Sequence, residues 1–198
     1  MASNKIKNIF LSASVPLPNR DPKYIETADI IAIRDAVIAL TTVVLPHHRI
    51  IWGGHPSITP LIYYVMNKLE MNIQNHVKMY QSLWFEDKFL EDNNKFQNIV
   101  FTPKLESIPS SIQQMREKMF AENDFYAAVF IGGMDGIIDE YKMFIDYHPN
   151  ALLLPIASTG AGAKIVYETL SPDELKNDRL VKDYGYMSLF QKLLMDKI

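Results

Sequence analysis

Short apolar, β-prone runs alternate with amphipathic segments of helical spacing along nearly the whole chain. This alternation is typical of a parallel sheet covered by helices, because each crossover between parallel strands needs a helix. The runs that we interpret as strands are 7–14, 48–54, 76–82, 98–103, 126–133 and 151–158. We therefore predict an α/β fold, a Rossmann-like three-layer sandwich with a mainly parallel sheet of five to six strands.

Amphipathic segments fill the gaps between these runs. In the first of them Ile30, Ile33, Val37 and Leu40 recur at helical spacing, and Thr27 precedes them as a candidate N-cap. The segment 83–96 mixes aromatic and acidic residues and fits the pattern least well, as a loop or short helix near the sheet edge. The predicted helices are 27–45, 57–71, 110–123, 139–148 and 163–170, with one or two more in the tail 171–198.

Length and composition place this sequence among ordinary globular chains. With 198 residues, 48% of them hydrophobic, and no repeat or linker, we expect a single domain over 1–198. A net charge of -3 argues against a protein that binds the nucleic-acid backbone. No cysteine is present, so thiolate sites and disulfides are excluded. The first residues are too weakly apolar for a secretory signal and no stretch approaches a membrane span, so we expect a cytoplasmic protein without membrane contact.

Seven of the eight glycines fall where a predicted strand passes into a helix. In a parallel sheet these junctions share the edge formed by the strand C-termini, where ligands bind in this architecture. Glycine brings backbone N–H groups close to a ligand, and a following helix N-terminus favours phosphate or carboxylate. Short turns also use glycine without any ligand, but three such junctions on one edge favour a common site. They contain Gly53 and Gly54, then Gly132, Gly133 and Gly136, then Gly160 and Gly162.

The stretch "SSIQQMREKMFAENDFYAAVFIGGMDGIIDEYKMF" resembles the signature region of the SLOG superfamily, which includes the Lonely Guy cytokinin-activating hydrolases and the Smf/DprA proteins. In Lonely Guy enzymes a helix bearing an arginine leads into a strand that ends in P-G-G-x-G-T-x-x-E. Arg116 matches that arginine without a gap, and with one inserted residue Gly136 matches the third glycine and Glu140 the glutamate. The similarity extends over roughly residues 7–165, although its specific part is the arginine helix and the glycine loop.

This sequence departs from the Lonely Guy pattern at several positions. Ile131 replaces the proline, Ile137 replaces the threonine, and Asp135 lies inside a loop that is one residue longer. The turn after the first strand, which bears glycine in the hydrolases, is "SAS" at 12–14. Losing a hydroxyl and gaining a carboxylate both weaken a phosphate site. The chain thus resembles a divergent bacterial branch, similar to SLOG domains of nucleotide-signalling and antiviral systems.

The resemblance implies a small nucleotide-type ligand, derived from a nucleotide or from NAD or ADP-ribose, and binding or sensing rather than catalysis. The alternative is a nucleotide N-glycosidase or phosphoribohydrolase in which Glu140 and Arg116 are catalytic, and a deoxyribosyltransferase-like enzyme is a third possibility. Such enzymes need a carboxylate near the anomeric carbon, where positive charge develops. Glu140 would equally complement a helix dipole, and Arg116 could be a solvated helix residue.

The predicted ligand site combines these loops with nearby hydroxyls and one histidine. Hydroxyl and imidazole groups can donate to phosphate, although in turns they also cap helices. We expect no cofactor and no metal, because the adjacent His47 and His48 would point to opposite faces of a strand. The resemblance further implies a homo-oligomer. The candidate ligand residues are Ser12, Ser14, Gly53, Gly54, His55, Arg116, Gly132, Gly133, Met134, Asp135, Gly136, Thr159, Gly160 and Gly162.

Overall fold

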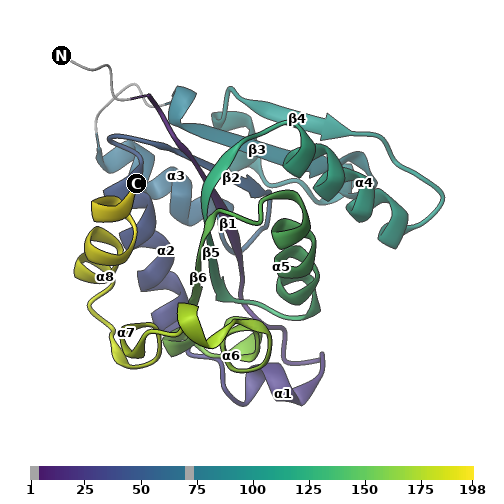
Figure 1. The fold of residues 1–198 in the computed structure, drawn as a ribbon. Helices are drawn as coiled ribbons and strands as arrows, with labels where there is room; N and C mark the ends of the chain where they lie inside the picture. The colour runs from purple at the N-terminus through teal and green to yellow at the C-terminus, as the bar shows by residue number, and fades with distance from the viewer. Residues whose placement is uncertain (1–4, 70–73) are drawn as a thin grey trace.

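The computed structural model describes residues 5–69 and 74–198, in which six strands form one sheet between two layers of helices (Figure 1). The strand order is β4-β3-β2-β1-β5-β6, and every neighbouring pair is parallel. The Rossmann-like α/β sandwich predicted from the sequence is therefore confirmed. The strands are β1 (Asn8–Ser14), β2 (Arg49–Gly53), β3 (Val77–Ser82), β4 (Ile99–Thr102), β5 (Phe125–Gly132) and β6 (Leu152–Ile156).

Helices cover both faces of the sheet, with α2, α3 and α8 on one side and α4, α5 and α6 on the other (Figure 1). The last two residues of the predicted helix 57–71 lie outside the described part of the chain. None of the helices in 5–69 and 74–198 combines the length and apolar character needed to cross a bilayer. The helices are α1 (Pro22–Ile25), α2 (Ile30–Val44), α3 (Thr59–Lys68), α4 (Ile108–Ala121), α5 (Asp135–Tyr147), α6 (Ala161–Ile165), α7 (Asp178–Lys182) and α8 (Tyr186–Leu193).

The two faces of the sheet bury different kinds of side chain. On the face of α2, three of the four predicted periodic residues, Ile33, Val37 and Leu40, are fully buried in an aliphatic core, whereas Ile30 in the first turn of α2 is 53% exposed. On the other face Phe10 is surrounded by aromatic rings, at 5.0 Å from Phe120 in an edge-on arrangement and at 5.5 Å from Phe144 in a stacked one. Such ring pairs add to the free energy gained by burying apolar area, so this layer holds α4 and α5 rigidly on the sheet.

The start of α2 differs from the sequence prediction. Asp29 is the N-cap, and its carboxylate accepts a 2.9 Å hydrogen bond from the N–H of Ala32. An aspartate is favoured here because its charge also complements the helix dipole. Thr27, predicted as the cap, instead accepts a 2.9 Å hydrogen bond from the N–H of Ala161 through its hydroxyl oxygen. The residues before α2 are thus tied to the loop before α6.

Strands β2, β3 and β4 follow one another on one side of β1, whereas β5 and β6 lie on its other side. β1 and β5 are therefore neighbours in the middle of the sheet. Their C-terminal ends meet, with Ser14 opposite Gly132 in the register. In open α/β sheets such a switch point opens a crevice in which ligands bind. After β3, the segment 83–96 forms two short 3₁₀ helices at the same edge of the sheet, Leu83–Lys88 and Glu91–Lys95.

Candidate functional site

A cavity of about 450 Å³ lies at the C-terminal edge of β2 and β3. One side is formed by the β2 and β3 ends, the opposite side by α4 and α5, and the rim by the segment 83–96. Its charged lining consists of two cations, Arg116 and Lys88, and one anion, Glu140. The cavity therefore carries a net positive charge, which favours an anionic ligand. The full lining is Leu17, Gly53, Gly54, His55, Pro56, Gln81, Ser82, Phe85, Lys88, Phe89, Leu90, Asn93, Ile112, Met115, Arg116 and Glu140.

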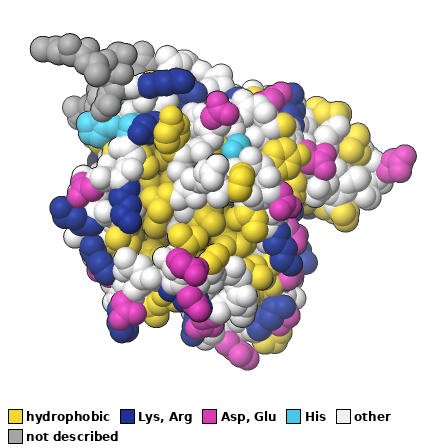
Figure 2. Space-filling view, viewed as in Figure 1, with side chains coloured by type: hydrophobic (Ala, Val, Ile, Leu, Met, Phe, Trp, Pro, Cys, Tyr) yellow, Lys and Arg dark blue, Asp and Glu magenta, His cyan; other side chains and the backbone are white. Residues whose placement is uncertain are grey.

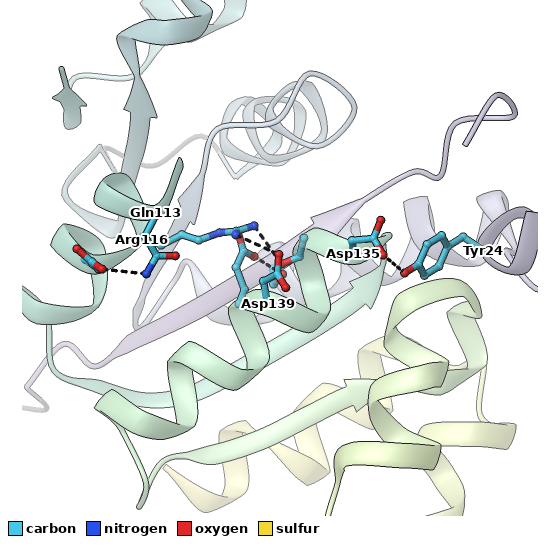
Figure 3. A network of polar contacts seen from close by, with 9 residues as sticks. Tyr24, Gln113, Arg116, Asp135 and Asp139 are labelled. Atoms are coloured by element: carbon cyan, nitrogen blue, oxygen red, sulfur yellow. Dashed lines mark hydrogen bonds and ion pairs between the residues drawn. The ribbon is translucent and has the colours of Figure 1, made fainter. Parts of the chain in front are cut away.

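Arg116 projects from α4 toward α5 at one end of this cavity (Figure 3). Its Nε donates a 3.1 Å hydrogen bond to Oε1 of Glu140, and its Nη2 donates one of 3.1 Å to the carbonyl oxygen of Gly136. Its Nη1 lies 3.6 Å from the Asp139 carboxylate. Two of the five guanidinium N–H groups are therefore used in hydrogen bonds within the protein, and Nη1 faces a second carboxylate.

Glu140 is held from two sides. Oε1 accepts from Arg116, and Oε2 accepts a hydrogen bond from the hydroxyl of Ser12 at the end of β1. The Glu140 side chain is 16% exposed and lines the cavity. A carboxylate has about four lone-pair sites, so two remain for donors of a ligand, such as sugar hydroxyls. The network fixes the orientation of the carboxylate, as both a binding group and a catalytic group require.

His55 lines the cavity beside the β2 end. Its Nδ1 faces the N–H of Ser57 at 3.2 Å and the Ser57 hydroxyl at 2.9 Å. Burial lowers the pKa of His55, because the charged ring is poorly solvated there. The ring is then neutral at pH 7, and since Nδ1 accepts from the Ser57 N–H, the proton lies on Nε2. His55 therefore offers an uncharged donor.

The double glycine of the second junction lies in the interior of the protein. Gly132 and Gly133 are buried and have positive φ of 58° and 77°, which favours glycine. A Cβ on Gly132 would lie 2.7 Å from Cγ1 of Ile33, and one on Gly133 would lie 2.5 Å from Cγ1 of Ile137. The N–H of Gly133 donates to the carbonyl oxygen of Ser14 at 2.8 Å. Packing of helices on the sheet therefore explains both glycines without a ligand.

The third junction packs against the second. The N–H of Gly162 donates to the carbonyl oxygen of Gly133 at 3.0 Å, and the hydroxyl of Thr159 accepts from the N–H of Gly132 at 2.9 Å. Gly160 has a φ of 71°, and a Cβ there would lie 2.5 Å from the backbone carbon of Thr27. All three glycine junctions thus lie at one sheet edge, as predicted, but the first is the one that lines the cavity.

The remaining loop residues surround the start of α5. Asp135 accepts a hydrogen bond from the Tyr24 hydroxyl of α1 (Figure 3), and burial followed by this contact raises the pKa of Tyr24. Met134 is the N-cap of α5 without a side-chain cap bond, and Gly136 serves as an acceptor for Arg116. The carboxylate that the sequence places in the glycine loop therefore binds α1, and α1 lies against this loop.

Several cavity residues were not among the predicted site residues. Gln81 and Asn93 are 6% and 5% exposed and contact one another, and Phe85 and Phe89 contribute aromatic rings to the lining. Three of the four belong to the segment 83–96, whose aromatic and polar mixture was visible in the sequence without indicating a role. A place directly after a strand at the ligand-binding edge was the signal that could have identified them.

Comparison with known proteins agrees with this architecture. A family model described as the SLOG cluster3 family matches residues 23–194. Among solved structures, the X-ray structure of TM1055, a target of the Northeast Structural Genomics Consortium, superposes with a TM-score of 0.61 at 13% sequence identity. That superposition covers 98% of this chain and 100% of the other, and at such low identity it shows a shared fold. No curated protein matches this sequence.

Proposed function

The chain belongs to the SLOG cluster3 family, and on this basis we propose that it binds a nucleotide or an NAD- or ADP-ribose-derived ligand in the 450 Å³ cavity. The observation that carries the proposal is the Ser12–Glu140–Arg116 network at the end of that cavity. A fixed carboxylate suits the vicinal hydroxyls of a ribose, and the guanidinium group that lines the same cavity suits a phosphate. We assign the protein a sensing role within a bacterial defence or signalling system that responds to such ligands.

The second candidate function is hydrolysis of the bond between base and ribose. In that reaction the C1′–N bond breaks, the oxygen of water bonds to C1′, and the proton of water goes to the departing base. Positive charge develops on the sugar ring, and a carboxylate beside the ring stabilises it or activates the water. Glu140 supports this candidate because it faces the cavity in a fixed orientation. A covalent, transferase-like route would use the same carboxylate.

One experiment separates the two functions. The protein is incubated with nucleoside monophosphates, NAD and cyclic ADP-ribose isomers, while the midpoint of thermal unfolding and the released base are followed. For binding alone we expect stabilisation without turnover, since a ligand held at 100 times its Kd adds about 2.7 kcal/mol to the free energy of unfolding. This stabilisation should disappear in Arg116→Ala and persist in Glu168→Gln, which changes an exposed carboxylate of the π-helical turn 166–170.

Catalysis predicts a different result. Base is released by the wild type and not by Glu140→Gln, whereas the control Glu168→Gln keeps the activity. That result would refute a purely sensing role. Absence of both stabilisation and turnover across the whole panel would refute the nucleotide-binding proposal itself.

A homo-oligomer remains part of the proposal. Hydrophobic side chains gather in the middle of the face on which β6 lies, with charged side chains around them (Figure 2). β6 is an edge strand, but Pro155 within it lacks an N–H group, a feature that discourages strand addition. We therefore expect association through side-chain packing. Sedimentation equilibrium should give a dimer or larger species for the wild type and a smaller one for Leu175→Glu, a residue of this face that is 39% exposed.

A further inference from the structure

We propose that the β3 end of the cavity is a subsite for a planar edge carrying a hydrogen-bond donor beside an acceptor, as in a nucleobase or the carboxamide of nicotinamide. Gln81 and Asn93 would bind this edge, and aromatic side chains of 83–96 would stack on its ring. This inference rests on the proposed function and adds which part of the ligand is recognised and where.

Gln81 and Asn93 form a buried polar pair with unused hydrogen-bonding capacity. The Asn93 Nδ2 donates to Gln81 Oε1 at 3.1 Å, and the two residues are 5% and 6% exposed. Within the described residues, neither the Gln81 Nε2 nor the Asn93 Oδ1 has a hydrogen-bond partner, and both side chains line the cavity. If the amide oxygen and nitrogen of both side chains are interchanged, one donor and one acceptor still remain open. The pair is therefore complementary to an edge of one acceptor and one donor.

The chemistry of this pair favours a base over a phosphate. Neither amide is charged, so the pair gives little to an anion, whereas buried polar groups gain most from a neutral partner that satisfies them. Adenine, other bases and nicotinamide all carry a donor beside an acceptor on one edge. A phosphate offers acceptors alone and would leave the amide oxygen without a partner.

The aromatic lining suits the ring of the same ligand. Phe85 and Phe89 line the rim, and the Phe89 ring stacks on Phe101 at 5.9 Å between centroids, which limits its motion. From the opposite side Ile112 and Met115 of α4 supply apolar contacts. Stacking on aromatic side chains accepts any base, because every base has a π-face. The rings would therefore supply affinity, and the amide pair would supply selectivity.

The strands that bound the cavity are spaced suitably for a nucleoside. Gln81 lies at the end of β3 and Asn93 in the 3₁₀ helix that follows, whereas Glu140 is bonded to Ser12 of β1, with β2 between β1 and β3. Two strand spacings amount to about 10 Å. A base at the amide pair thus places its ribose close to Glu140.

The first glycine pair has a clear role in this arrangement. A Cβ on Gly54 would lie 2.5 Å from Gln81 Nε2, and a Cβ on Gly53 would lie 3.1 Å from the terminal methyl of Met115. These glycines therefore make room for the base subsite, where the sequence interpretation had assigned them to phosphate.

The test compares ligands that share a ribose phosphate and differ in the base. Isothermal titration calorimetry of the full chain uses AMP, nicotinamide mononucleotide and ribose 5-phosphate. We expect at least one base-bearing ligand to bind about tenfold or more tightly than ribose 5-phosphate, as a single satisfied hydrogen bond and a stacked ring require. In Gln81→Met this advantage should shrink about tenfold while affinity for ribose 5-phosphate stays unchanged. The matched control is Gln113→Met, on the exposed side of α4, which should bind as the wild type does.

The possible failures are distinguishable. Equal binding of all three ligands by the wild type, or unchanged discrimination in Gln81→Met, would overturn the subsite and leave the proposed function standing. No binding of any of the three would overturn the proposed function and the subsite with it. If Gln81→Met does not fold, Phe85→Leu provides the same test, because it keeps an apolar side chain and removes the ring. Unchanged discrimination in that variant would count against the subsite.

Discussion

Removing Arg116 alone should destabilise the protein more than removing Arg116 and Glu140 together. In Arg116→Met the Glu140 carboxylate, whose side chain is 16% exposed, loses its charged partner and keeps the Ser12 hydroxyl as donor. Breaking a fully buried pair in this way costs about 3–5 kcal/mol. Because the two side chains keep 11% and 16% exposure, we expect the lower end, about 3 kcal/mol.

The double variant Arg116→Met, Glu140→Met removes the buried charge and keeps apolar volume. We expect it to cost about 1 kcal/mol, so that adding Glu140→Met to Arg116→Met restores about 2 kcal/mol of the free energy of unfolding. Equilibrium unfolding in urea measures both values, and with a slope near 3 kcal/mol per molar the single variant should unfold about 1 M earlier. Asp139→Asn is the control, because this carboxylate is 60% exposed and should change stability by at most about 0.5 kcal/mol. Additive effects of the two substitutions, within about 0.5 kcal/mol, would refute the reasoning.

Three further predictions concern the surroundings of the site. Gly160→Ala combines a positive φ with a clash against backbone and should cost about 2–4 kcal/mol in urea unfolding, whereas Gly185→Ala, at negative φ on the surface, should cost under about 1 kcal/mol. Tyr24→Phe leaves the Asp135 carboxylate without its hydroxyl donor and should lower the free energy of unfolding by about 1–2 kcal/mol, with faster proteolysis of residues 15–29 as a second readout. Burial lowers the pKa of His55, so the unfolded chain binds this proton more readily than the folded one does. The free energy of unfolding is therefore unaffected by His55 protonation above the unfolded pKa near 6.5, and it decreases as the pH falls below that value. Urea midpoints measured between pH 7.5 and 5 should fall less in His55→Gln than in the wild type.

Local sequence patterns predicted the fold because helices and strands differ in the spacing of their apolar residues. Buried parallel strands appear as continuous apolar runs, and α2 shows its buried stripe at helical spacing. The N-terminal end of α2 was harder to predict from local patterns. Thr27 and Asp29 are both good caps, and the choice between them depends on a contact between Thr27 and Ala161 that is far away in the sequence.

The candidate site, like the fold, was predictable in part. The family resemblance assigned Arg116 and Glu140 to one site, and in the structure the Arg116 Nε donates a hydrogen bond to Glu140 Oε1. That Gly132, Gly133, Gly160 and Gly162 are buried could not be derived, because they pack on one another and on Ile33, Ile137 and Thr27 from distant parts of the sequence. A glycine that makes room for a helix and one that makes room for a phosphate are identical in a sequence.

The environment of Asp135 indicates where a ligand would bind. In the sequence it was the residue that argued most strongly against a phosphate in the glycine loop, because a carboxylate repels an anion. The structure gives it a hydrogen-bond donor in Tyr24, while the N–H groups of Gly132 and Gly133 are bonded to Thr159 and Ser14. A loop whose groups are satisfied within the protein gains little from a ligand. The open hydrogen-bonding capacity lies instead along the cavity from Glu140 to the β3 end, and a nucleotide that binds there would be recognised by its sugar and base more than by its phosphate.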